Sequence, residues 1–175
     1  MTTPGIRITP AQPDDLGGLL AMIHALADYE KLSHLVVADH AALAKALFGD
    51  KPVVEALIAR ESLENSPPAG FALFFPTFST FLGRSGLWLE DLFVYPAYRG
   101  RGIGRALLCH LAGIARDRGC GRFEWAVLDW NAPALRFYEG VGATLMPDWR
   151  ICRVVGPALD RLADAPPTPT ERDPG

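Results

Sequence analysis

A strand-to-helix segment at residues 92–104 decides the fold, and it reads LFVYPAYRGRGIG. Its apolar start predicts a buried strand, and the apolar spacing from Ile103 to Arg118 predicts an amphipathic helix. The glycines between them allow a close approach to the backbone, and the helix N-terminus presents N–H groups to an anion. The segment therefore predicts a phosphate-binding site. The alternative is a solvated loop that only joins a strand to a helix.

The spacing of the glycines narrows the choice of phosphate compound. Gly100, Gly102 and Gly104 stand at alternate positions, which is not the Gly-x-Gly-x-x-Gly of a dinucleotide site. The Gly-Lys-Ser/Thr of a P-loop is also absent from this segment. Both ATP and NAD are therefore disfavoured as ligands.

The flanking sequence predicts strands that are mixed with helices along the chain. Runs of alternating, aromatic or β-branched residues predict strands at 6–11, 53–60, 69–78, 86–95 and 122–128, with one or two closing strands within 143–155. Helical periodicity predicts helices at 16–32, 39–48, 103–118 and 131–140. These elements predict an α/β fold with a central mixed β-sheet flanked by helices. We expect one domain over residues 1–163 and a Pro-rich flexible tail over residues 164–175.

Composition and charge exclude several classes of partner. The chain has 175 residues with 17 Lys+Arg and 20 Asp+Glu, and its net charge of −3 provides no basic field for nucleic acid. No apolar run reaches the roughly 18 residues of a membrane span. The three cysteines lack a metal-binding spacing, and no two histidines stand four residues apart with an acid beside them, so we expect no metal. The expected protein is cytoplasmic, with neither nucleic acid nor membrane as a partner.

Several motifs carry a resemblance to a known family. Arg99-x-x-Gly102-x-Gly104 resembles the acetyl-CoA pyrophosphate loop of the GNAT superfamily of N-acetyltransferases. LEDLFV at 89–94, VLDWN at 127–131 and FYEGVGA at 137–143 look like the diamine acetyltransferase subgroup, which includes the spermidine/spermine N1-acetyltransferases. The sequence is most similar to the thialysine N-epsilon-acetyltransferases of that subgroup. The resemblance spans about residues 5–160 and implies the GNAT acyl-CoA N-acyltransferase fold.

The resemblance implies that acetyl-CoA is the co-substrate and indicates the residues that bind it. Backbone groups of the strand at Leu92, Phe93 and Val94 are expected to pair with the pantetheine arm. The helix that starts near Asn131 is expected to border the coenzyme, although Asn131 also fits an N-cap role. The pyrophosphate is expected at Arg99, Gly100, Arg101, Gly102, Ile103, Gly104 and Arg105, and the border of the coenzyme at Asn131, Ala132, Pro133 and Ala134.

The same resemblance implies two catalytic residues. Tyr138 matches the tyrosine that protonates the departing thiolate and lies beside the coenzyme, and a packing role is its alternative. Glu90 matches the substrate-side glutamate, and it stands in an apolar run where an isolated acid is costly unless it faces a cleft or a partner. Since an amine substrate arrives protonated, we expect Glu90 to accept its proton, directly or through water. One of Glu90 and Asp91 is alternatively an ion-pair partner of an arginine.

The expected acceptor is a primary amine of a small cationic diamino compound, attacked directly in a ternary complex. The resemblance implies substrate contacts at Tyr29, Glu30, Glu90, Glu124 and Asp148. Ser79 and Phe81 stand near positions where polyamine-specific members have an acid and a tryptophan, which favours short diamino compounds over spermine. The family also implies a homodimer. Two other functions stay open, a protein or peptide N-acetyltransferase and a non-catalytic acetyl-CoA sensor.

Overall fold

The computed structural model describes residues 5–63 and 66–165. Contacts between residues divide the chain into two compact units, one that ends at Leu135 and one that begins at Arg136. The single domain over residues 1–163 stays a prediction, and most of the expected tail, from residue 166 on, lies outside the described residues.

A five-stranded sheet forms the centre of the first unit. Its strands are β1 (Ile6–Pro10), β2 (Glu55–Glu61), β3 (Pro68–Ser79), β4 (Arg84–Val94) and β5 (Arg122–Trp125). They lie in the order β1-β2-β3-β4-β5. Each neighbouring pair from β1 to β4 is antiparallel, and β5 runs parallel to β4. The predicted mixed sheet is therefore confirmed.

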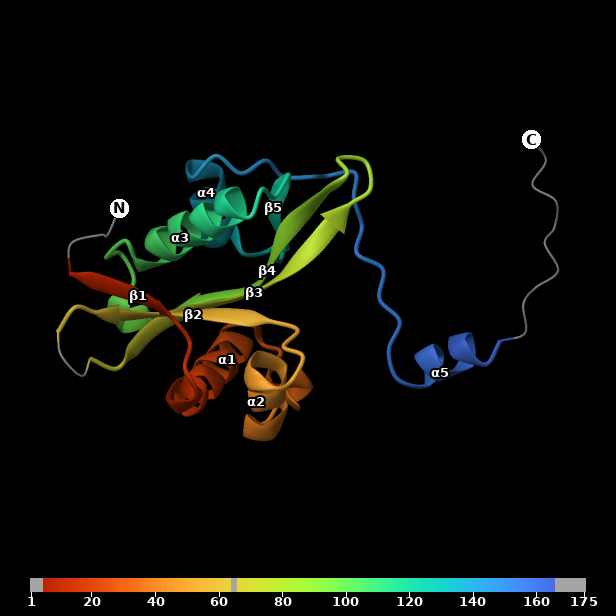
Figure 1. The fold of residues 1–175 in the computed structure, drawn as a ribbon, viewed down its shortest axis with the longest axis horizontal. Helices are drawn as coiled ribbons and strands as arrows, with labels where there is room; N and C mark the ends of the chain where they lie inside the picture. The colour runs from red at the N-terminus through yellow and green to blue at the C-terminus, as the bar shows by residue number, and fades with distance from the viewer. Residues whose placement is uncertain (1–4, 64–65, 166–175) are drawn as a thin grey trace. The chain divides into compact units, whose positions relative to one another are not determined.

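Helices cover both faces of this sheet (Figure 1). Helices α1 (Leu16–Glu30) and α2 (His40–Phe48) lie on one face, and α3 (Ile103–Asp117) lies on the other. Leu19 and Met22 of α1 pack with Phe71 and Phe93 of the sheet in one buried cluster. Three short 3-10 turns complete the connections, at Pro13–Asp15, Ser33–Leu35 and Pro96–Tyr98. The apolar residues whose spacing predicted these helices are thus the residues that the helices bury.

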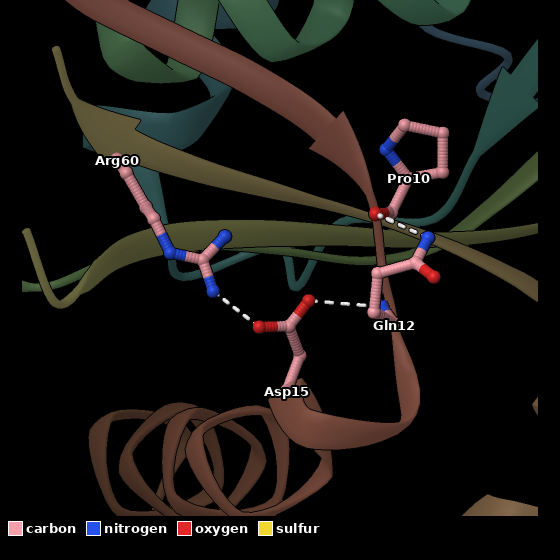
Figure 2. Close-up of polar contacts among 4 residues, drawn as sticks. All are labelled: Pro10, Gln12, Asp15 and Arg60. Atoms are coloured by element: carbon pink, nitrogen blue, oxygen red, sulfur yellow. Dashed lines mark hydrogen bonds and ion pairs between the residues drawn. The ribbon is translucent and has the colours of Figure 1, made fainter. Parts of the chain in front are cut away.

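A polar cluster fixes the start of α1 against β2 (Figure 2). The Asp15 carboxylate accepts a hydrogen bond of 2.9 Å from the backbone N–H of Gln12 and also forms an ion pair with Arg60. The side chains of Asp15 and Arg60 are only 12% and 15% exposed. Because the pair is largely removed from water, loss of either partner would leave the other charge largely buried and unpaired.

The second unit contains most of the difference from the predicted fold. Helix α4 (Ala132–Gly140) crosses the boundary between the units and confirms the helix expected at 131–140. The closing strands expected within 143–155 were wrong, because that range contains no strand. Residues such as Ile151 and Val155 favour strands, but they pair with no strand among the described residues and are 70% and 64% exposed. A strand preference becomes a strand only where a partner supplies the hydrogen bonds. A short helix that the sequence analysis missed, α5 (Pro157–Ala163), follows them.

Candidate active site

The sheet opens between β4 and β5. The parallel pairing runs from Gly86 opposite Arg122 to Leu89 opposite Trp125 and stops there, whereas β4 continues to Val94. Beyond Leu89, β4 therefore has no strand neighbour on that side among the described residues. Backbone groups of an open strand edge can pair with an extended ligand. The edge includes the three residues at 92–94 that were expected to pair with pantetheine.

A β-bulge lies at the start of this open edge. Leu73 of β3 pairs with Asp91, and the next residue of β3, Phe74, pairs with Leu89, which leaves Glu90 as the extra residue. Such a bulge changes which side chains share a face of the sheet. Asp91 stands two residues before Phe93, whose side chain belongs to the core cluster beneath α1 and α2. The bulge thus brings two adjacent carboxylates to the opening.

The loop between β4 and α3 is shaped by two glycines. Gly100 and Gly102 have φ angles of 74° and 80°, a left-handed conformation that other residues rarely adopt. Gly102 is also the N-cap of α3, and no side chain caps this helix. The first N–H groups of α3 are therefore available to an external acceptor, which fits the pyrophosphate of acetyl-CoA.

The three arginines of the loop do not play equal parts. Arg99 donates from Nε to the carbonyl oxygen of Val94 at 2.9 Å, so its side chain is directed back toward the strand. Arg101 forms an ion pair of 2.6 Å with Glu61 and lies 5.5 Å from the centre of the Tyr98 ring. Arg105 is exposed in the first turn of α3. The prediction that all three bind pyrophosphate remains untested.

Three carboxylates lie close together at the opening. Glu90 is exposed and accepts a hydrogen bond of 2.9 Å from Trp88 Nε1. Burial, with the nearby charges of Glu90 and Glu30, raises the pKa of Asp91 to about 6. Burial also raises the pKa of Glu30, at the end of α1. Asp91 takes part in none of the ion pairs found among residues 5–63 and 66–165, so the alternative of a paired arginine fails for it.

Tyr29 and Asn131 connect α1 to the start of α4. The Tyr29 hydroxyl donates to Asn131 Oδ1 at 3.3 Å, and the same oxygen accepts the backbone N–H of Ala134 at 3.3 Å. Asn131 therefore acts as an N-cap of α4, which was one of its two predicted roles. Ala132 and Pro133 are exposed in the first turn of the helix.

The remaining predicted residues lie on β5, in the second unit and in the β3–β4 hairpin. Glu124 lies on β5 and forms an ion pair of 2.7 Å with Arg122. Tyr138 and Asp148 belong to the second unit. Ser79 is 4% exposed, and its hydroxyl accepts the backbone N–H of Leu82 at 3.2 Å, while Phe81 is 97% exposed in the same hairpin.

The sequence analysis missed the chemistry of Asp91. Its position in an apolar run was a signal, but the same signal applied to Glu90, which is exposed. The bulge gives Glu90 and Asp91 different surroundings, because Asp91 pairs with Leu73 of β3 and Glu90 is the extra residue. The position of the bulge depends on this pairing with β3, which the local sequence does not show.

The described residues contain neither a metal-binding cluster nor a membrane-spanning helix. No group of three or more His, Cys, Asp and Glu residues in the described ranges is placed to hold a metal ion. Within those same ranges, every helix is too short or too polar to cross a membrane.

The open sheet beside a glycine-rich helix N-terminus places the chain in the class of acyl-CoA-dependent transferases. A model of the acetyltransferase (GNAT) family matches residues 21–143. The chain therefore belongs to the GNAT acetyltransferase family and is an acetyltransferase. Members of this family use acetyl-CoA as the acetyl donor, as the resemblance of the Arg99–Gly104 loop predicted.

Individual relatives agree with this assignment. Thialysine N-epsilon-acetyltransferase of Mus musculus is 39% identical over 166 residues, which cover 90% of this chain and 96% of that protein. L-ornithine N5-acetyltransferase NATA1 of Arabidopsis thaliana is 32% identical over 198 residues, which cover 89% of this chain and 87% of that protein. A solved structure of an integron cassette protein from the mobile metagenome of V. cholerae matches with a TM-score of 0.76 and 28% identity, covering 92% of this chain and 99% of that one.

Proposed function

We propose that the enzyme acetylates a primary amine of a small cationic diamino compound, a thialysine-like amino acid or a diamine. The observation that carries the proposal is the group of carboxylates Glu30, Glu90 and Asp91 at the open end of β4, beside the coenzyme loop. Carboxylates attract a cationic amine and disfavour anionic substrates through unpaired charge. The similarity to a thialysine and an ornithine acetyltransferase supports the same substrate class.

The coenzyme is proposed to lie along the open edge and the loop. In this arrangement Leu92, Phe93 and Val94 offer backbone groups to the pantetheine arm, and the residues from Arg99 to Arg105 hold the pyrophosphate. Residues 131–134 border the coenzyme on the other side. When bound, acetyl-CoA supplies an acetyl group activated as a thioester.

The proposed reaction is a direct attack by the amine within a ternary complex. The ammonium group must first lose a proton, and the exposed carboxylate of Glu90 is proposed to accept it. The amine nitrogen then forms a bond to the acetyl carbon as the carbon–sulfur bond breaks, and the nitrogen releases its second proton to solvent, from which the Tyr138 hydroxyl is later restored. The Tyr138 hydroxyl is proposed to donate a proton to the departing sulfur, a role that rests on its place in the family pattern.

Asp91 is the second candidate for the proton acceptor. A carboxyl with a pKa of about 6 is closer to the operating pH than an ordinary aspartate, and it is therefore a stronger base once ionised. Tyr29 and Glu30 are proposed to line the amine site with these carboxylates, and Glu124 and Asp148 are proposed as outer substrate contacts.

A competition experiment tests the substrate class. Acetyl-CoA is added to a mixture of thialysine, spermine and a basic peptide at equal concentration, and the acetylated products are counted by mass spectrometry at low conversion. The proposal predicts that acetyl-thialysine dominates. A dominant peptide product would instead indicate an open groove for an extended chain. Initial velocities at several concentrations of both substrates test the mechanism, and intersecting double-reciprocal lines are expected.

We also propose that the enzyme is a cytoplasmic homodimer. The exposed apolar side chains Phe78, Phe81 and Leu82 at the β3–β4 hairpin support self-association. The free cysteines Cys109, Cys120 and Cys152 fit a reducing compartment.

A further inference from the structure

The ring of Tyr29 is in contact with the first arginine of the coenzyme loop. The guanidinium carbon of Arg99 lies 5.0 Å from the centre of the Tyr29 ring and 5.9 Å from the centre of the Phe93 ring. Its Nε is already bound to the carbonyl oxygen of Val94. Arg99 is thus held between the end of β4 and the end of α1, because a guanidinium stacks well on aromatic faces.

The other side of Tyr29 reaches the connection that leads into α4. Its hydroxyl donates to Asn131 Oδ1 at 3.3 Å, and its ring centre lies 6.1 Å from that of Trp130. Asn131 is 9% exposed, so this hydrogen bond is largely shielded from water. Tyr29 therefore contacts both segments expected to hold acetyl-CoA, the loop at Arg99 and the helix start at Asn131.

We propose that Tyr29 is a positioning residue for the coenzyme site, which acts through Arg99 and Asn131. This inference rests on the proposed function, which gives Tyr29 only a place in the amine site. The ring keeps the Arg99 side chain against the strand, and this fixes the start of the loop before Gly100 and Gly102 turn it. The hydroxyl keeps Asn131 oriented to cap α4. Because Tyr29 is 38% exposed, part of the residue also remains open to solvent.

The test measures the affinity for CoA itself, without amine, by titration calorimetry on the full chain. Tyr29→Leu removes both contacts and is expected to weaken CoA binding about three- to thirty-fold, the range for one stacking contact. Tyr29→Phe keeps the ring and is expected to change this affinity less than threefold. Glu30→Gln is the matched control at the same helix end, and it is expected to raise the KM for the amine without changing the Kd for CoA.

A double-mutant cycle tests whether Tyr29 acts through Arg99. In the Arg99→Gln background, Tyr29→Leu is expected to produce little further loss of CoA affinity. Unchanged CoA affinity in Tyr29→Leu, with a raised amine KM alone, would overturn the proposal and leave Tyr29 as a pocket residue. If Tyr29→Leu does not fold, Arg99→Lys decides the point, since it keeps the charge but loses the planar stack and is expected to weaken CoA binding. CoA affinity equal to the wild type in Arg99→Lys would overturn the proposal.

The proposed substrate and the proposed role of Tyr29 would be contradicted by different results. Wild-type enzyme that binds CoA but acetylates no small amine would contradict the proposed substrate and leave the role of Tyr29 testable by the same titrations. Additive losses from Tyr29→Leu and Arg99→Gln would contradict the positioning role and leave the proposed substrate intact.

Discussion

At the scale of single residues, the geometry of the sheet affects the pKa of the Asp91 carboxyl. The bulge at Glu90 gives Asp91 the face of the sheet that packs beneath α1, where burial and two neighbouring carboxylates raise its pKa to about 6. The folded protein therefore binds this proton more tightly than the unfolded chain does. Ionised Asp91 costs folding stability, and the cost appears as the pH rises from about 4 to about 6.

Asp91→Asn is expected to make the protein more stable and less active. The variant cannot ionise, so its free energy of unfolding at pH 8 should exceed that of the wild type by about 1–3 kcal/mol. Wild-type kcat/KM for a small diamine should fall about tenfold per pH unit below about pH 6, and this limb should be absent from the variant. Urea unfolding and pH–rate profiles measure the two effects.

Glu90→Gln is the matched control for Asp91→Asn. Glu90 is exposed, so its loss should leave stability within about 0.5 kcal/mol of the wild type. The limb should persist in this variant and move to lower pH, even if turnover falls, because the charge of Glu90 contributes to the raised pKa of Asp91. Equal stability of the wild type and Asp91→Asn at pH 8 would show that Asp91 is not held in an unfavourable environment.

Tyr138→Phe is expected to lower kcat about ten- to ten-thousand-fold, the range for one general acid. Affinity for CoA should change little, because the ring is kept and only the hydroxyl is lost. Steady-state kinetics and calorimetry measure the two quantities. Unchanged turnover would assign Tyr138 to packing and remove it from the chemistry.

At the scale of elements, local sequence patterns predicted most of what was found. The apolar spacing of α1 and α3 and the glycines of the coenzyme loop are local signals. The Glu90 bulge and the Tyr29–Arg99 stack depend on residues distant in sequence, so no local pattern could reveal them. The strands predicted within 143–155 were wrong for a related reason. These residues favour a strand, but no neighbouring strand pairs with them among the described residues.

The join between α1 and β2 gives a prediction at this scale. Asp15→Asn removes the charge that pairs with Arg60 and weakens the acceptor for the Gln12 N–H (Figure 2). We expect a loss of about 1–3 kcal/mol in the free energy of unfolding, since the remaining arginine is largely buried. The matched control is Arg116→Gln, which breaks the exposed pair with Asp117 and should cost less than about 0.5 kcal/mol. Equal losses in the two variants would mean that a largely buried arginine left unpaired costs no more than breaking an exposed pair.

At the scale of the whole molecule, the proposed homodimer predicts a mass twice the 19.0 kDa of one chain. Light scattering at micromolar concentration measures it directly. If the hairpin takes part, Phe81→Asp should shift the equilibrium toward monomer, because it places a charge in the interface. A wild-type protein that stays monomeric at these concentrations would contradict the dimer.

The most direct test of the central claim is the rate of CoA-thiol release from acetyl-CoA with each amine alone. The series comprises thialysine, ornithine, lysine, putrescine, spermidine, spermine and a basic peptide. The carboxylates at Glu30, Glu90 and Asp91 predict activity on small cationic amines rather than on the peptide. Ser79, near the position where polyamine-specific members have an acid, predicts the highest kcat/KM for the short diamino compounds and a lower value for spermine. A highest kcat/KM for the peptide, or no thiol release with any small amine, would contradict the proposed function.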